Sequence, residues 1–131
     1  MQFVKDNKIN KKLLNKAQAA LFLLVSVRNS KVIKYGECYG FLSRVDKKII
    51  DDVLKQNKFN GGLVRLIKLS DYDGYIFLAT VENISIEKMR VLVRQFARAA
   101  KAENIKNIAF NVSDVTAKGL AEEIALNVLL A

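Results

Sequence analysis

A strand–helix–strand pattern spans residues 75–112 and limits the possible folds of this chain more than any other stretch. Residues 75–81 form a continuous apolar run rich in β-branched and aromatic side chains, which is typical of a buried strand. Residues 85–104 have the periodicity of a helix, and residues 107–112 form a second short apolar run. Because a helix of this length usually connects parallel neighbouring strands, the pattern predicts an α/β fold.

The other apolar segments predict the rest of a mixed sheet. Residues 19–27 show no polar alternation, which predicts a central strand buried on both faces. Residues 63–69 lie only a short turn before residues 75–81, so these two strands should form an antiparallel hairpin. Shorter strands are predicted at residues 2–5, at a sheet edge, and at residues 32–35.

Two amphipathic helices are expected to cover this sheet. Residues 45–56 carry an apolar stripe at helical spacing, and Gly61 and Gly62 then allow the positive φ of a tight return. The second helix begins after Ser85, a good N-cap. The stripe of the first helix centres on Val45, Ile49 and Val53, with Ile50 and Leu54 less central, and the core face of the second consists of Ile86, Met89, Val93, Phe96, Ala97 and Ala100.

A last helix is expected at residues 117–131. No Gly, Asn or Pro follows it, and its final residues are Val-Leu-Leu-Ala. Such an apolar, uncapped end indicates either that the helix packs onto this domain or that a larger protein continues beyond it.

Length and composition restrict the class of protein. With 131 residues, of which 51% are hydrophobic, the chain is long enough for one domain with a core. Its longest apolar run, residues 17–27, is about half of the roughly 20 residues that cross a bilayer, so no membrane partner is expected. The single cysteine, Cys38, excludes an internal disulfide and favours a cytoplasmic location. The chain contains no histidine, which removes Ser-His and Cys-His nucleophiles and His-ligated metals.

Several short sequences resemble chemical sites but have simpler interpretations. The sequence at residues 71–74 lacks the later carboxylates of a calcium loop and is interpreted as a turn. The pairs Asp51-Asp52 and Glu122-Glu123 lie on helices, where neighbours diverge by about 100°, and are interpreted as solvated faces. Cys38 has no neighbouring base, and the glycine pair at residues 61–62 lacks the ending of a phosphate loop. The residues alone therefore predict no catalytic, cofactor-binding or metal site.

The net charge of +9 makes basic surfaces of interest. Arg90, Arg94, Arg98 and Lys101, here named the cation stripe, follow one another about one helical turn apart. Such a row of cations can track the phosphates of a nucleic acid. The outer face of a core-facing helix must also be polar, and no stacking aromatic residues accompany the stripe, so a solvated surface is the competing interpretation.

The order of segments resembles the N-terminal domain of the cytosol (leucyl) aminopeptidases, peptidase family M17. Two stretches depart from the family pattern: Thr80-Val-Glu-Asn83 stands where glycines are usual, and residues 36–44 have no counterpart. The similarity runs through residues 19–28, then 45–62 with their closing Asn57-Lys-Phe-Asn-Gly-Gly62, then 63–69, 75–81, 85–101, 107–112 and 117–126.

The resemblance implies a macro-domain-like mixed sheet flanked by helices, in a single non-catalytic domain of residues 1–131. In the family, a C-terminal domain cuts peptide bonds with two divalent metals, such as zinc or manganese. Their lysine and carboxylate ligands and the sequence Asn-Thr-Asp-Ala-Glu-Gly-Arg are absent from this chain. Two-metal hydrolysis needs those ligands, so this chain alone should not be an enzyme, whereas the parent protein would be an aminopeptidase.

The implied role is structural, assembly-related or regulatory. The implied partners are the catalytic aminopeptidase domain, further copies in a hexamer, and DNA, which some family members bind as regulators. Two alternatives stay open. One is a nucleic-acid-binding module that uses the cation stripe and the N-terminal lysines. The other is a macro-type binder of a small molecule such as ADP-ribose, although no phosphate-cradling glycine loop is visible.

Overall fold

The computed structural model describes residues 2–6 and 19–111, which contain both strands and helices. No helix within these residues is both long and apolar enough to cross a membrane. The helix predicted at residues 117–131 lies outside the described residues. The elements in order are β1 (Gln2–Asp6), β2 (Ala19–Arg28), β3 (Lys31–Tyr35), the 3₁₀ helix η1 (Glu37–Phe41), α2 (Arg44–Gln56), β4 (Val64–Lys68), β5 (Tyr75–Val81), α3 (Ile86–Ala102) and β6 (Asn107–Asn111).

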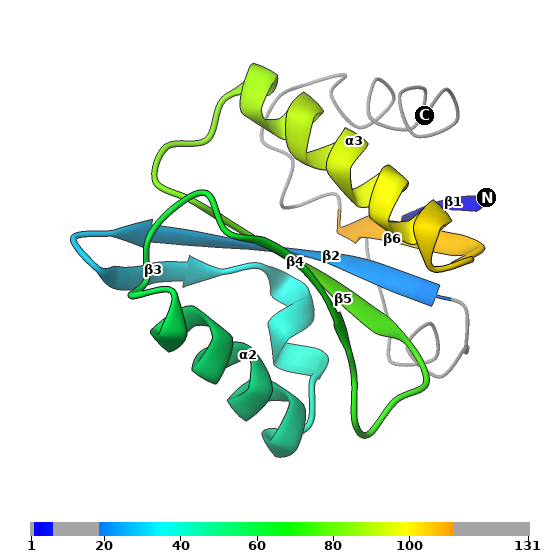
Figure 1. Ribbon diagram of the computed structural model, residues 1–131, viewed down its shortest axis with the longest axis horizontal. Helices are drawn as coiled ribbons and strands as arrows, with labels where there is room; N and C mark the ends of the chain where they lie inside the picture. The colour runs from blue at the N-terminus through cyan, green and yellow to red at the C-terminus, as the bar shows by residue number, and fades with distance from the viewer. Residues whose placement is uncertain (1, 7–18, 112–131) are drawn as a thin grey trace.

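One mixed sheet contains all the described strands, with the order β1-β6-β2-β5-β4 (Figure 1). β1, β6, β2 and β5 are parallel, and β4 pairs antiparallel with β5, which confirms the predicted hairpin. β3 lies off this path and pairs antiparallel with β2. β1 lies at the sheet edge, as predicted for residues 2–5. The described residues form a single small α/β domain with a mixed sheet, as expected.

The long strand β2 is the centre of the sheet. Along one edge it pairs with β5, and along the other it pairs with β6 near its start and with β3 near its end. The loop between β2 and β3 is only Asn29 and Ser30, which have φ values of 52° and 61°. Positive φ at both positions is the geometry of the type I′ turn, whose twist matches that of the two strands.

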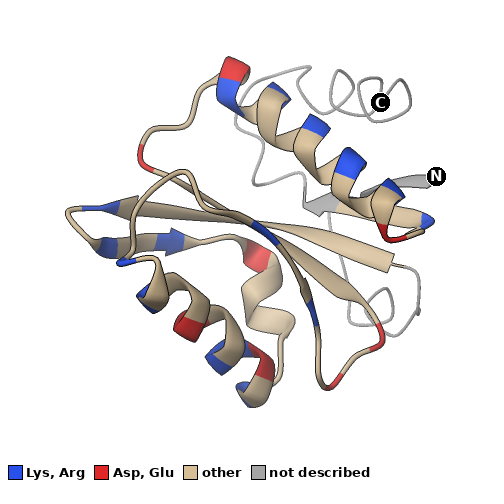
Figure 2. Cartoon of the chain, viewed as in Figure 1, with Lys and Arg blue, Asp and Glu red and all other residues tan. Residues whose placement is uncertain are grey.

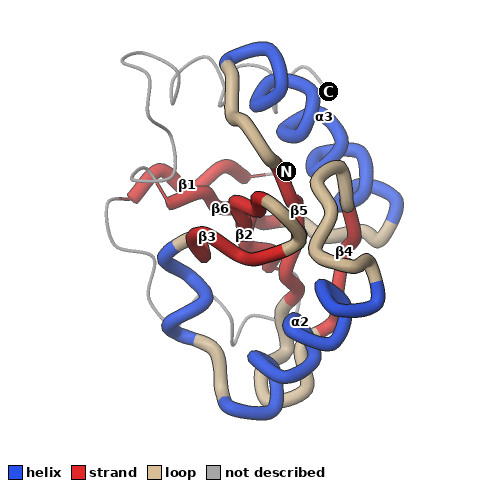
Figure 3. Tube along the Cα trace, turned by 90° about the vertical axis from the view of Figure 1, so that its left-hand side faces the viewer, coloured by secondary structure: helices blue, strands red, loops and turns tan. Residues whose placement is uncertain are grey.

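Each face of the sheet is covered by a different helix, α3 on one side and α2 with η1 on the other (Figure 1; Figure 3). Alternate side chains of β2 serve the two faces: Phe22 packs with α3, whereas Leu21 and Leu23 pack with α2 and η1. Because both faces are covered, nearly all of β2 is buried, which confirms the prediction of a central strand.

The strand–helix–strand unit differs from its prediction in one respect. β5, α3 and β6 are present and the two strands are parallel, but they are not neighbours, because β2 lies between them and pairs with both. The crossover through α3 therefore spans a strand that comes earlier in the chain. Periodicity in a sequence indicates the elements but carries no information on which strand enters between them.

The predicted apolar stripe of α2 is rotated by about one position. Ile50 and Leu54 are fully buried, whereas Val45 is 53% exposed. Asp46 occupies the corresponding buried place in the first turn. Ile49 and Val53 still pack, partly buried, against the core, so the predicted stripe lies beside the centre of the buried face rather than opposite to it.

The core face of α3 is close to the prediction. Met89, Val93, Phe96, Ala97 and Ala100 are buried as expected. Two positions differ, because Leu92 is also buried and Ile86 is 41% exposed at the start of the helix.

The turn after α2 is closed without glycine. Lys58 and Phe59 take φ values of 57° and 53°, and the Phe59 N–H donates to the Leu54 carbonyl at 3.0 Å. The prediction placed the positive φ of this turn at Gly61 and Gly62. Of these two glycines only Gly62 has a positive φ, of 85°, and it follows the turn that Lys58 and Phe59 form. Phe59 packs against the α2 side of the core, which offsets its backbone strain.

Candidate functional site

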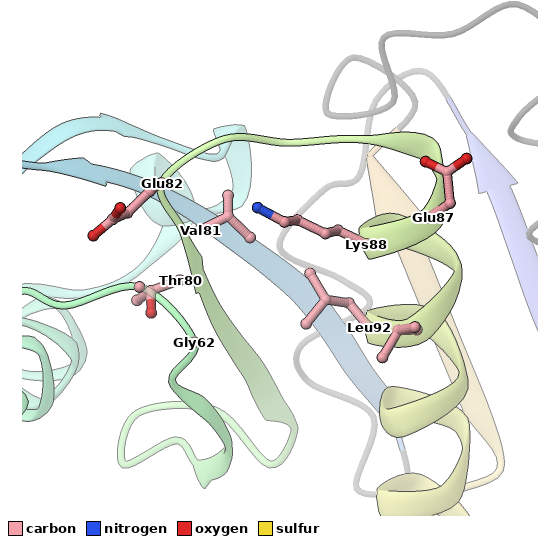
Figure 4. Close-up of a pocket in the computed structure, with 9 residues that line it drawn as sticks. Gly62, Thr80, Val81, Glu82, Glu87, Lys88 and Leu92 are labelled. Atoms are coloured by element: carbon pink, nitrogen blue, oxygen red, sulfur yellow. The ribbon is translucent and has the colours of Figure 1, made fainter.

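A cavity of about 500 Å³ lies at the carboxyl end of β5 (Figure 4). Three segments line it: Gly61 and Gly62 before β4, residues 80–82 at the end of β5, and the first turns of α3. The volume is within the range of about 300–1,000 Å³ that is usual for small-molecule sites.

The cavity lies beside the point where the chain connections change face. β2 and β5 are parallel neighbours. The chain leaves β2 for β3, η1 and α2, which pack on one face, and leaves β5 for α3 on the other face. In open α/β sheets, the carboxyl ends of strands at such a switch point are where ligands bind.

Thr80 fixes the loop that forms one wall of the cavity. Its hydroxyl donates to the Asn60 carbonyl at 2.8 Å and accepts the Leu63 N–H at 2.9 Å. Its carbonyl accepts the Gly62 N–H, and its N–H donates to the Leu63 carbonyl, both at 2.9 Å. One buried residue therefore makes four hydrogen bonds to residues 60–63, which holds that wall rigidly against β5.

The two glycines have different roles in this wall, and Gly61 is the one that lies close to the end of β5. A Cβ atom at Gly61 would come within 3.1 Å of Glu82 Cγ and 3.3 Å of the Glu82 backbone nitrogen. Gly62 has a positive φ, which side chains other than glycine adopt at a cost. Gly61 thus serves close backbone packing and Gly62 serves the positive φ of the turn, and neither forms the phosphate cradle that the sequence analysis excluded.

The opposite wall is the amino-terminal end of α3. Ser85 caps the helix as predicted, since its hydroxyl accepts the Lys88 N–H at 3.1 Å. The Lys88 ammonium donates to the Asn83 carbonyl at 2.8 Å. This side chain therefore turns back over the β5–α3 loop instead of extending along the helix.

Charged side chains at the cavity point in different directions (Figure 4). Lys88 extends from α3 toward Val81, across the gap between helix and strand. The carboxylates of Glu82 and Glu87 point away from that gap. The three charges therefore do not converge as an acid–base pair would, and the ammonium group of Lys88 is the charge that faces the cavity.

None of the four residues of the cation stripe lines this cavity. Arg94, Arg98 and Lys101 are exposed, and Arg90 is partly buried. Figure 2 shows cations along the outer side of α3, away from the sheet. The structure thus places the predicted stripe on one helix face, as its spacing required.

A second polar cluster joins β3, η1 and α2. The Tyr35 hydroxyl donates to Asp51 Oδ1 at 2.9 Å, and the Tyr39 hydroxyl lies 3.0 Å from Asp51 Oδ2. The two rings are stacked with centroids 3.9 Å apart. Burial, followed by the hydrogen bond to Asp51 and its charge, raises the pKa of Tyr39 to about 12. The same causes raise the pKa of Tyr35.

This cluster corrects the interpretation of the Asp51-Asp52 pair. Asp52 is exposed as expected, but Asp51 is half-buried and accepts both tyrosine hydroxyls. The two carboxylates do diverge, as neighbours on a helix must. The cluster joins three elements, and the Asp51 carboxylate accepts hydrogen bonds from two neutral hydroxyls. We therefore interpret the cluster as structural.

The remaining candidates have structural partners. The Cys38 thiol is fully buried and lies 3.5 Å from the Phe22 carbonyl. Residues 71–74 belong to the turn between β4 and β5, as interpreted from the sequence. Within residues 2–6 and 19–111, no three His, Cys, Asp or Glu side chains form a group that could hold a metal ion.

Sequence reasoning missed Thr80 and Lys88 as parts of a site. For Lys88 a signal was present: Ser85 begins the helix, and three residues later the usual glutamate of a capping box is replaced by lysine. For Thr80 the only signal was a hydroxyl inside an apolar strand, which does not indicate its partners.

Comparisons with protein families, with curated proteins and with solved structures find no match to this chain.

Proposed function

We propose that this chain is a non-catalytic domain of the type that accompanies the two-metal catalytic domain of leucyl aminopeptidases. Its role would be structural, assembly-related or regulatory, and its sheet would be of the macro-domain-like kind. The catalytic partner, with its two divalent metals, and a hexameric assembly belong to this proposal.

The order of the elements supports the proposal. A buried strand, a helix with a glycine-containing return, a hairpin, a long helix and a short parallel strand follow one another as β2, α2, β4–β5, α3 and β6. This is the order of the segments that carry the resemblance, and they form one mixed sheet between two helices.

A binding and activity experiment tests the proposal. The purified chain is mixed with the separately purified catalytic domain of a leucyl aminopeptidase, loaded with Mn²⁺ or Zn²⁺. We expect the chain alone to leave leucine p-nitroanilide intact and to bind the catalytic domain, with a mass change seen by sedimentation equilibrium.

The control is an unrelated small protein of similar positive charge, because a net charge of +9 favours nonspecific association. Turnover by the chain alone, or association no stronger than that of the control, contradicts the proposal.

A second candidate function is nucleic-acid binding by the cation stripe. It is favoured by the exposure of Arg94, Arg98 and Lys101 on a helix face turned away from the sheet (Figure 2). Phosphate contacts by such residues make binding strongly dependent on salt.

Fluorescence anisotropy with labelled single-stranded and duplex DNA at increasing KCl tests this candidate. Joint Arg94→Glu and Arg98→Glu substitution should weaken binding and reduce the slope of log K against log salt by about 2. The matched control reverses Lys48 and Lys55, two exposed cations of α2. Equal weakening in both variants would show a net-charge effect and reject the stripe as a site.

A further inference from the structure

The cavity at the end of β5 has an apolar interior. Val81, Leu92 and Val91 contribute to its lining. Val81 and Leu92 are buried, but Val91 is 52% exposed although it stands in the second turn of a helix that packs on the core. Apolar surface in this position would lose contact with water if a ligand filled the cavity, which is favourable.

Lys88 gives the cavity a positive charge at an unusual place. It is the third residue of α3, where the helix dipole disfavours a cation and where glutamate would complete the cap. Its ammonium group reaches across the gap and donates to the Asn83 carbonyl, which is a neutral acceptor. A carboxylate would be a stronger acceptor for this ammonium group than the carbonyl is. The helix terminus adds a further positive potential at the same end of the cavity.

The carboxylates at the rim limit the charge of a ligand. Glu82 and Glu87 line the cavity, although both carboxylates point away from it in Figure 4. A ligand with several negative charges, such as a nucleoside diphosphate, would be repelled by these two carboxylates, and among the described lining residues only Lys88 would attract it. A ligand with a single negative charge would keep the attraction to Lys88 with less of this repulsion.

We propose that the cavity beside Val91 binds a small molecule that has an apolar body and one carboxylate, with the carboxylate on Lys88 and the body on Val81, Val91 and Leu92. The volume of about 500 Å³ suits a molecule of this class. This binding site goes beyond the accessory role proposed above and does not depend on it.

Octanoate is the probe, with 1-octanol and octylamine as matched neutral and cationic molecules. Binding is followed by calorimetry and by the methyl NMR signals of Val81, Val91 and Leu92. We expect saturable binding of one octanoate per chain, weaker binding of octanol and none of octylamine, with shifts concentrated at those three methyl-bearing residues.

Two pairs of variants test the two halves of the site. Val91→Trp places a bulky indole at the cavity and should block binding, whereas Val45→Trp, at a position of nearly equal exposure on α2, should not change it. Lys88→Met should weaken octanoate about tenfold and leave octanol unchanged, because it removes one charge-assisted hydrogen bond. Lys101→Met, at the other end of α3, is its control. Circular dichroism melting checks that each variant is folded.

Three results would overturn the proposal. The first is no saturable octanoate binding, or binding that Val91→Trp leaves unchanged in a folded protein. The second is tighter binding of octylamine or of ADP-ribose than of octanoate. The third is a concentration-dependent dimer that Val91→Trp abolishes, since the occupant would then be a second copy of the chain.

Discussion

The buried carboxylate of Asp46 accepts the backbone N–H of Ser70 at 2.7 Å, although the two residues are 24 positions apart. The same carboxylate accepts the Asp71 N–H at 3.2 Å. The first turn of α2 is therefore bonded to the loop between β4 and β5. This contact explains why a charged residue is fully buried in the stripe of a helix that otherwise presents apolar side chains to the sheet.

Replacing Asp46 by alanine should strongly destabilise the fold. The substitution leaves two backbone N–H groups without their acceptor, which we expect to lower the free energy of unfolding by about 2–4 kcal/mol. Urea denaturation followed by circular dichroism measures this loss. Asp52→Ala, on the same helix but exposed, is the control and should stay within about 0.5 kcal/mol of the wild type. Equal effects at the two positions would contradict the role given to Asp46.

Thr80→Val should loosen the wall of the cavity while keeping its shape. Valine has nearly the same volume but cannot bond the Asn60 carbonyl or the Leu63 N–H. We expect a loss of about 1–3 kcal/mol in unfolding free energy and faster hydrogen exchange at Leu63. Thr80→Ser keeps the hydroxyl and should preserve the slow exchange. If valine and serine behave alike, the hydroxyl does not hold the loop.

Lys58→Gly should stabilise the protein. Lys58 has a φ of 57°, a conformation that costs a residue with a side chain about 1 kcal/mol and costs glycine little. We therefore expect a gain of up to about 1 kcal/mol, measured by urea denaturation. Lys55→Gly, in the last turn of α2, is the control with the opposite expected sign, because glycine weakens a helix interior. A loss of stability at position 58 would refute this account of the turn.

Stability should fall at high pH through the tyrosine cluster. A tyrosine ionises near pH 10.0 in the unfolded chain, whereas in the fold the pKa of Tyr39 is raised to about 12 and that of Tyr35 is also raised. Between these values the unfolded state loses its proton and the folded state retains it, so rising pH favours unfolding. The stabilising contribution is complete below pH 10 and is lost toward pH 12.

Urea denaturation at a series of pH values from 8 to 11 tests this dependence. The double variant Tyr35→Phe with Tyr39→Phe should lose less stability over that range than the wild type does. Parallel curves for the two proteins would mean that this tyrosine cluster does not cause the dependence on pH.

Periodicity and turn chemistry were enough to predict most elements of this fold. The unbroken apolar run of β2 indicated burial on both faces, and the short turn after residue 69 indicated the β4–β5 hairpin. These features depend on neighbouring residues and are therefore visible in the sequence. The place of β2 between β5 and β6 depends on hydrogen bonds between segments far apart, which no local pattern records.

The candidate site was less predictable for the same reason. The cation stripe follows from helical spacing, but the cavity depends on loop 60–63 meeting β5 and α3 in space. Asp46 illustrates the limit well, because only its distant amide partners explain why this charged residue is buried.

The pairing of β1 with β6 has a consequence for how the chain folds. In this ladder Gln2 stands opposite Asn107, so forming it closes a loop that contains almost all of the described chain. Closing so long a loop costs much conformational entropy before its stabilising contacts form. The β4–β5 and β2–β3 hairpins close much shorter loops, so their entropy cost is smaller. Folding should therefore begin at the hairpins and end with the pairing of β1 and β6. During synthesis, this pairing can form only after residue 111 has emerged from the ribosome.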